Sequence, residues 1–190
     1  MRLFIAVELP EPVLAALAKV QRQVRSKTSK GRFAAVGGMH LTLCFLGETA
    51  PEMTQRLAPL LQKTAAAGQP CWLRFEEKLR YFGKERPARV VWVGLQEEQN
   101  ALRQLQGFVA QDVEKAGLPR EERAYVPHVT LARNCVFSAG VPLAQGAIQL
   151  SAPRLPEFEV TGFSLMISEL IDGKRIYRAL ERFAFPRACL

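Results

Sequence analysis

The chain has 190 residues, 48% of them hydrophobic and 23% charged, and a formal net charge of +8 at pH 7. This length and composition are typical of a globular protein with one domain or two small lobes. No apolar run approaches the roughly 20 residues that a membrane span requires. The N-terminus becomes charged too soon for a signal peptide. We therefore expect a single bilobal domain over residues 1–190, in the cytoplasm and without membrane contact.

The positive charge is concentrated near the N-terminus. No Asp or Glu lies between Glu11 and Glu48. The same stretch contains six cations: Lys19, Arg22, Arg25, Lys27, Lys30 and Arg32. Such a segment favours an anionic partner, nucleic acid above all, although a solvated helix face is the simpler interpretation.

The first predicted elements alternate between strand and helix. Residues 2–9 alternate in polarity and end at Pro10, which indicates a strand. Residues 11–26 predict an amphipathic helix, residues 26–38 a basic and then Gly-rich loop with at most a short strand, and residues 40–46 a second strand. The apolar stripe of the helix consists of Val13, Leu17, Val20 and Val24.

A second helix is predicted after the 40–46 strand. Thr49 and Glu52 match a capping box, with Thr49 as N-cap and Glu52 at the third helical position. Pro59 inside this helix predicts a kink or a break. The apolar face of the helix contains Met53, Leu57, Leu60 and Leu61.

The second half repeats these element types. Residues 71–82 and 90–94 predict two strands, and residues 97–116 predict a helix that Gly117 ends. The inward face of that helix consists of Leu102, Leu105, Val109 and Val113. Residues 128–133 predict a further strand. The tail predicts a hairpin that turns at Asp172 and Gly173 and returns through Ile176 to Leu180.

The only two histidines of the chain begin the same four-residue motif, H-x-T-L. His40 begins the first copy and His128 the second. Leu3 precedes His40 by the same number of residues, 37, that separates Val91 from His128. Each block therefore predicts strand, helix, loop and motif strand, which indicates duplicated α+β lobes that face each other across a cleft.

The motif has a chemical rationale on a strand. Residues i and i+2 point to the same face, so His40 projects with Thr42 and His128 with Thr130. Two imidazoles on opposite sides of a phosphate can serve as general base and general acid for an in-line displacement. Two hydroxyls can hydrogen-bond the non-bridging oxygens. The pattern thus predicts a phosphoryl-transfer site that needs no metal.

Other chemistries have weaker support. Neither histidine lies in an H-x-x-x-H setting, and the chain has neither a G-x-x-x-x-G-K-[ST] phosphate loop nor a G-x-S-x-G elbow. We accordingly expect no metal and no cofactor. The cysteines fit no zinc pattern, so we expect four free thiols, mostly buried: Cys44, Cys71, Cys135 and Cys189.

The sequence resembles the two-histidine phosphoesterase superfamily, defined by paired H-x-[ST]-x motifs. Within it, the chain looks most like the bacterial and archaeal RNA 2′,3′-cyclic phosphodiesterases, formerly called 2′-5′ RNA ligases. Residues 40–48 read H-L-T-L-C-F-L-G-E and residues 127–133 read P-H-V-T-L-A-R. Residues 2–10 and the closing hairpin also fit. The chain departs at residues 35–39, which lack the Pro and the acidic or Asn residues expected there, and this affects the cleft rim.

The resemblance implies an α+β, bilobal two-histidine phosphoesterase fold, with two pseudo-symmetric antiparallel-sheet lobes, helices outside and a central cleft. It implies opening of a terminal 2′,3′-cyclic phosphate on RNA to a 2′-phosphate, with a weaker reverse 2′-5′ ligation. His40 would be the general acid and His128 the general base. Thr42 and Thr130 would hold the phosphate. Two further ligands are implied: Arg133 for the phosphate and Phe45 for the terminal base.

These last two residues have the opposite strand parity to their histidines. Phe45 and Arg133 reach the cleft only if each strand ends or bulges after its threonine. Alternatives for the whole protein also remain. The same fold could act on a small cyclic nucleotide or a 2′-5′-linked oligonucleotide, or the chain could be a non-catalytic RNA-binding protein. For the substrate we expect RNA, with transfer RNA fragments as one candidate, and for the protein a monomer.

Overall fold

The computed structural model describes residues 1–96, 100–144, 146–151 and 154–186. Its helices are α1 (Glu11–Ser26), α2 (Glu52–Ala66), α3 (Asn100–Lys115) and a 3-10 turn, η1 (Val36–Gly38). Its strands are β1 (Arg2–Glu8), β2 (Thr28–Phe33), β3 (His40–Glu48), β4 (Cys71–Leu73), β5 (Phe75–Phe82), β6 (Ala88–Leu95), β7 (His128–Phe137), β8 (Leu143–Ala144), β9 (Ala147–Ser151), β10 (Phe158–Val160), β11 (Gly162–Ile171) and β12 (Lys174–Ala184).

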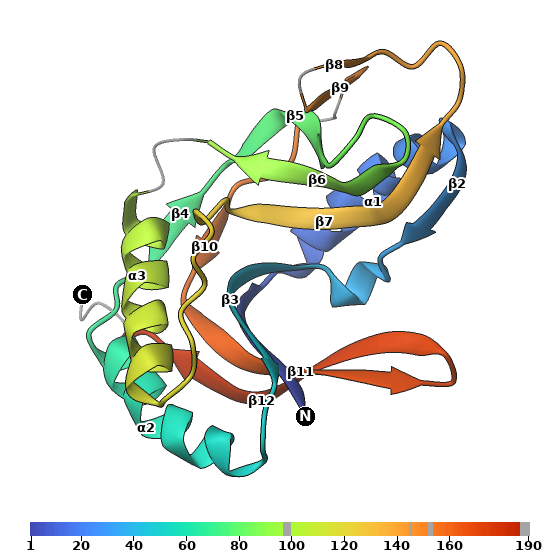
Figure 1. Ribbon diagram of the computed structural model, residues 1–190. Helices are drawn as coiled ribbons and strands as arrows, with labels where there is room; N and C mark the ends of the chain where they lie inside the picture. Colours follow the sequence, from blue (N-terminus) through green and yellow to red (C-terminus); the bar gives the residue numbers. More distant parts are fainter. Residues whose placement is uncertain (97–99, 145, 152–153, 187–190) are drawn as a thin grey trace.

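The strands form an antiparallel arrangement that is nearly symmetric about its centre. In the described ranges the main sheet has the order β12-β11-β1-β3-β7-β6-β5-β9-β8, with β2 beside β7, and β4 and β10 pair separately. The centre is the β3–β7 junction, where Leu41 pairs with Val129. The two halves on either side of it are the expected pseudo-symmetric lobes, and the fold is α+β as predicted (Figure 1).

The helices pack on one face of this sheet, which we call the helix-covered face. α1 follows β1 in the chain but contacts β7 and β2 of the other half, whereas α3 follows β6 and contacts β3 and α2 (Figure 1). The main core therefore combines residues from both halves, such as Ile5, Leu41 and Val129. A smaller cluster lies on the opposite face, which we call the open face: Phe4, Ala6 and Met166, with Tyr177 and Ala179 against them.

The duplication is visible in the strand register, but not in the spacing that suggested it. Ile5 pairs with Cys44, four residues after His40. Val91 pairs with Ala132, four residues after His128. The structural counterpart of Val91 is therefore Ile5 rather than Leu3. The equal spacing was a coincidence, because the structurally equivalent pairs, Ile5 with His40 and Val91 with His128, are 35 and 37 residues apart in the sequence.

Both long predicted helices are confirmed, with their apolar stripes buried. The capping box is wrong. Pro51 is the N-cap of α2 and makes no side-chain cap bond. The Thr49 hydroxyl instead donates to the Met1 carbonyl at 3.2 Å, because Thr49 closes the β1–β3 ladder. α2 runs through Pro59 without a break. Pro59 and Gln55 are both exposed, so water can bond the Gln55 carbonyl that Pro59 leaves free.

The basic loop contains the short strand that the sequence allowed, the six-residue β2. Three strand predictions need correction. The 71–82 segment divides at Arg74 into β4 and β5, because β4 pairs with β10 and β5 with β6. β3 and β7 continue beyond the predicted 46 and 133 to Glu48 and Phe137. The first three positions of the predicted 97–116 helix, residues 97–99, lie outside the described residues, and α3 begins at Asn100.

The closing hairpin is confirmed. β11 and β12 pair along their whole length and turn at Asp172 and Gly173, whose φ angles are 49° and 72°. Cys44, Cys71 and Cys135 are free thiols, and burial raises the pKa of Cys44 and Cys135 to about 11. Cys189 lies outside the described residues. None of the described helices has the length and apolar character to cross a bilayer.

Candidate active site

The site lies where the two motif strands meet. Leu41 on β3 pairs with Val129 on β7 in antiparallel register, and both are fully buried in the core. Extending that register by one residue sets His40 opposite Thr130 and Thr42 opposite His128. Side chains that are diagonal across such a pair are about 7–8 Å apart. The two imidazoles therefore flank a space of phosphate size, and each lies opposite the hydroxyl of the other motif.

Both imidazoles are fixed in the same tautomer by backbone carbonyls. Nδ1 of His40 lies 2.8 Å from the Gly38 carbonyl oxygen. Nδ1 of His128 lies 2.7 Å from the Val126 carbonyl oxygen. A carbonyl can only accept, so Nδ1 carries the proton in each ring and donates it. Nε2 of each neutral imidazole is then the nitrogen available for proton transfer.

The surroundings favour the neutral form of both histidines. Burial lowers the pKa of His40 below its ordinary value of 6.5, and the positive charges of Arg133 and His128 lower it further against the effect of the Gly38 carbonyl. Burial also lowers the pKa of His128, with Arg133 as an additional cause. The guanidinium of Arg133 thus acts on both rings, which indicates that it lies near the phosphate-sized space.

Each motif strand has an irregularity immediately after its threonine. Ala6 pairs with Thr42 and Ile5 with Cys44, so the β1 register skips Leu43. The same shift occurs on the other side, where Trp92 pairs with Thr130 and Val91 with Ala132. The condition for Phe45 and Arg133 to reach the cleft is therefore met. Both side chains are exposed beyond these bulges, Phe45 at 56%.

Two long-range hydrogen bonds support the bulges. The buried amide of Gln21 on α1 donates to the carbonyl of Leu131, the residue that the register skips on β7, at 2.9 Å. The hydroxyl of Tyr125 donates to the Thr42 carbonyl at 3.1 Å, and burial raises the pKa of that phenol. Neither residue was predicted from the sequence to support the site. For Gln21 a signal exists, since it is a polar residue within the apolar stripe of its helix.

Two aromatic rings contact each imidazole. Phe4 and Tyr177 lie 4.6 and 5.0 Å from the His40 ring, measured between centroids. Phe82 and Trp92 lie 5.3 and 5.4 Å from the His128 ring. These rings exclude water from one side of each histidine, which explains the lowered pKa values. Trp92 is only 6% exposed, and its indole Nε1 has no hydrogen-bond partner among the described residues.

An ion pair lies beside His40. Glu8 pairs with His40 across β1 and β3. Its carboxylate accepts two bonds from Arg182, at 2.8 and 3.0 Å, and one from Ser164 at 2.6 Å. These bonds, that of Arg182 foremost, lower the pKa of Glu8. Glu8, His40 and Tyr177 line a hollow of about 320 Å³, together with Arg182. The charges nearest to His40 on this surface, Glu8 and Arg182, therefore neutralise each other.

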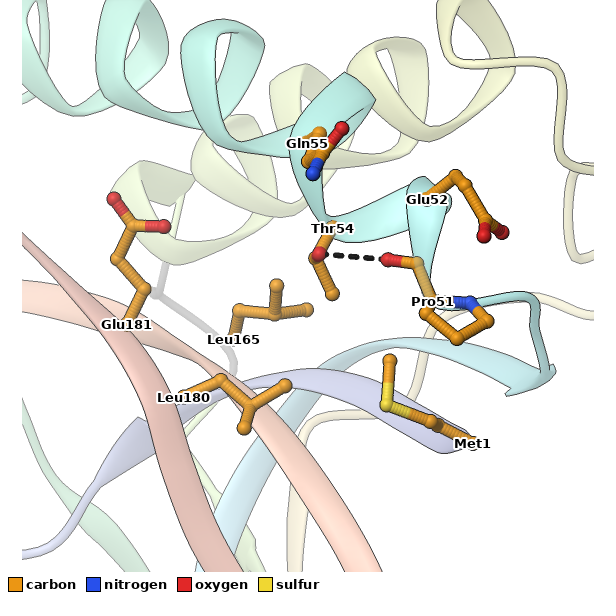
Figure 2. Close-up of a pocket in the computed structure, with 8 residues that line it drawn as sticks. All are labelled: Met1, Pro51, Glu52, Thr54, Gln55, Leu165, Leu180 and Glu181. Carbon is orange, nitrogen blue, oxygen red and sulfur yellow. Dashed lines mark hydrogen bonds between the residues drawn. The ribbon is translucent and has the colours of Figure 1, made fainter.

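A larger hollow of about 460 Å³ lies elsewhere, between the start of α2 and the β11–β12 pair (Figure 2). It contains neither histidine. Two carboxylates, Glu52 and Glu181, contribute to its lining. The Thr54 hydroxyl, which also lines it, donates a hydrogen bond to the Pro51 carbonyl at 2.8 Å. Because carboxylates repel anions, this hollow does not suit a phosphate. Among the described residues, no group of three or more His, Cys, Asp or Glu could hold a metal ion.

The chain is similar in sequence and in structure to known proteins. An RNA 2′,3′-cyclic phosphodiesterase of Thermus thermophilus is 34% identical, over 97% of this chain and 90% of its own. The crystal structure of TT0787 from Thermus thermophilus matches with a TM-score of 0.79 at 31% identity, over 97% and 98% of the two chains. Escherichia coli LigT in complex with 3′-AMP matches with a TM-score of 0.75 at 26% identity, over 98% of both chains.

A model of a protein family also matches the sequence of this chain. The model described as the 2′-5′ RNA ligase superfamily matches residues 9–170, a range that includes both H-x-T-L motifs. It also includes the two bulges and most of the strands that support the histidines. This chain belongs to the 2′-5′ RNA ligase superfamily.

Proposed function

We propose that the protein is an RNA 2′,3′-cyclic phosphodiesterase that opens a terminal cyclic phosphate to a 2′-phosphomonoester. One observation carries the proposal: the Leu41–Val129 register, which sets each histidine opposite the threonine of the other motif. The identical Nδ1 bonds of the two histidines, to Gly38 and Val126, support it. The names of the relatives supply the substrate class.

In this mechanism two protons move while one bond forms and one breaks. Nε2 of His128 accepts a proton from water as the water oxygen attacks phosphorus. The bond between phosphorus and the ribose O3′ breaks, and protonated His40 donates a proton from Nε2 to that oxygen. The products are a 2′-phosphate and a 3′-hydroxyl. General acid and base catalysis of this kind contributes roughly 10²–10⁴-fold each.

The remaining residues hold the substrate. The hydroxyls of Thr42 and Thr130 donate to the non-bridging oxygens, and Arg133 neutralises their charge. Phe45 offers an exposed ring for the terminal base to stack on. All of these groups lie on the two motif strands, β3 and β7, and the proposed steps use neither a metal nor a cofactor. With Nε2 free on both rings, the same groups can also catalyse weak 2′-5′ ligation, in which the 5′-hydroxyl of a second RNA takes the place of water and O3′ leaves as before.

The proposal also covers the domain organisation, the oligomeric state, the compartment and the partner of the protein. We expect residues 1–190 to act as one bilobal catalytic domain, because α1 and α3 each pack on the half of the sheet opposite to the strand that they follow. We expect a monomer in the cytoplasm, where free thiols such as Cys44 and Cys135 stay reduced. RNA with a 2′,3′-cyclic phosphate end, such as a transfer RNA fragment, is the expected partner.

The deciding experiment is hydrolysis of a short RNA that ends in a 2′,3′-cyclic phosphate, with EDTA present. We expect a 2′-phosphate product from the wild type and none above background from His40→Ala. A requirement for added divalent metal would contradict the mechanism. Faster turnover of a small cyclic nucleotide or of a 2′-5′-linked oligonucleotide would favour a different substrate. Salt-sensitive RNA binding without turnover, unchanged in His40→Ala, would favour a binding protein.

A further inference from the structure

The strand β2 presents a row of cations on the open face. The residues on either side of Arg32 face the core: a Cβ on Gly31 would lie 2.8 Å from the sulfur of Cys135, and Phe33 packs against the main core. Because alternate residues point to opposite faces, Lys30 and Arg32 project to the face that carries the histidines. Both are exposed.

Arg32 lies directly opposite Arg133 across the β2–β7 pair. Like charges at opposed positions of an antiparallel pair destabilise it. Among the described residues none of Arg32, Arg133 and Lys30 takes part in an ion pair, since the ion pairs there use other cations. The fold thus places two exposed arginines at opposed strand positions, and neither forms an ion pair with a described carboxylate. Such an arrangement binds an anion favourably.

The other half of the molecule differs beside its own motif strand. β3 continues past its bulge to Glu48, and among the described strands only β1 pairs with it there, whereas β7 has β2 as a second neighbour. The nearby cation Arg182 is neutralised by Glu8 at 2.8 Å. The open face is therefore asymmetric in charge: this row of cations without partners lies on the side of His128.

We propose that Arg32, with Lys30 next to it, is a second phosphate subsite that holds the RNA backbone on the 5′ side of the terminal cyclic phosphate. The inference rests on the proposed function and names its substrate class more closely: a single-stranded oligonucleotide rather than a mononucleotide. Opposed Cβ atoms are about 4.5–5.5 Å apart, and residues i and i+2 on a strand about 6.7 Å. The row Arg133, Arg32 and Lys30 thus leads stepwise away from the reacting phosphate.

The test compares two substrates with the same terminal nucleoside: a nucleoside 2′,3′-cyclic phosphate without a 5′-phosphate, and a trinucleotide that ends in that group. We expect Arg32→Gln to lower kcat/KM for the trinucleotide about tenfold, the loss of one charge-assisted bond, and to leave the mononucleotide unchanged. The slope of log kcat/KM against log salt concentration should become shallower by about 0.7, the value for one phosphate contact on a single strand. Arg32→Lys should restore most of the loss.

Arg22→Gln is the matched control, because it removes the same charge from the exposed side of α1, which packs on the helix-covered face. It should change neither substrate. An equal loss on both substrates, or no loss on either, would overturn the subsite while leaving the phosphodiesterase activity in place. If the wild type hydrolyses neither substrate, the proposed function fails. Binding of the 2′-phosphate trinucleotide to wild type and Arg32→Gln then decides the subsite: equal affinities would overturn it.

Discussion

The two halves of the site have the same proton chemistry but different ligand chemistry. Each half provides a histidine whose Nδ1 donates to the carbonyl two residues earlier, a threonine, and a bulge after it. At the fifth position after the histidine, however, one half has Phe45 and the other Arg133. Opposite the threonines lie Ala6 in one half and Trp92 in the other. The duplicated backbone thus keeps the same placement of histidine and threonine in both halves, while the side chains next to them differ.

The largest effect is expected where the halves are most alike. His40→Ala and His128→Ala should each lower kcat roughly 10²–10⁴-fold, because each removes one proton-transfer group. The double variant should be little slower than either single one, since both groups act in the same step. Single-turnover rates on the cyclic phosphate RNA measure this. If one of the two single variants kept most of its activity, the histidine that it lacks would not be a proton-transfer group.

Arg133 should matter for every substrate. Arg133→Gln should lower kcat roughly 10²-fold on mononucleotides and oligonucleotides alike, because it removes charge stabilisation at the non-bridging oxygens. Steady-state kinetics on both substrates provide the comparison. A loss confined to oligonucleotides would move Arg133 from the reacting phosphate to the RNA backbone.

The same variant should shift the pH dependence. Burial and the charge of Arg133 hold the pKa values of His40 and His128 below 6.5, so kcat/KM should be bell-shaped with its optimum on the acidic side of that value. Removing a positive charge stabilises both protonated rings and raises both pKa values. The profile of Arg133→Gln should therefore move to higher pH. An unchanged profile would mean that Arg133 lies too far from the rings to act on them.

Phe45 should affect binding more than rate. Phe45→Ala should raise KM about tenfold through lost base stacking, with kcat little changed. Its exposure predicts no loss of stability, which thermal unfolding can check. Phe45→Leu is a control that keeps apolar bulk without the aromatic ring. If Leu restores binding fully, stacking is not the interaction.

The smallest effect concerns Trp92. Its buried indole N–H lacks a partner among the described residues, so Trp92→Phe removes an unsatisfied donor while it leaves a modest cavity. We expect the free energy of unfolding to change by no more than about 1 kcal/mol, against about 3–5 kcal/mol for Trp92→Ala. Urea unfolding followed by circular dichroism measures both. A large loss in Trp92→Phe would show that the N–H has a partner after all, such as bound water.

The features that the sequence predicted well are those with a local cause. Three features depend only on neighbours within a few residues in the sequence: the apolar stripes of α1 and α3, the turn at Asp172 and Gly173, and the alternation around both histidines. From the sequence, the bulges after Thr42 and Thr130 could be stated only as a condition for Phe45 and Arg133 to reach the cleft. The partners that support them, Gln21 for Leu131 and Tyr125 for Thr42, are 110 and 83 residues away in the chain.

Distant partners also explain the errors. The division of residues 71–82 depends on β10, which no local pattern connects to β4. Thr49 is not the cap of α2, because its backbone N–H and its hydroxyl both donate to the Met1 carbonyl at the end of the β1–β3 ladder. β7 extends four residues past its predicted end because β2 pairs with it there. In each case a tertiary contact overrode a local preference, as propensity rules allow.

The single pairing of Leu41 with Val129 has a consequence for the direction of the reaction. Equivalent residues of two repeats that meet in antiparallel register mark a local two-fold axis. An in-line displacement at phosphorus has the same symmetry, because the entering and leaving oxygens exchange places when the step runs backwards. We expect the backbone to impose no preferred direction. Which oxygen departs is then decided by the groups that break the symmetry, Phe45 and Arg133, through the orientation in which they hold the RNA.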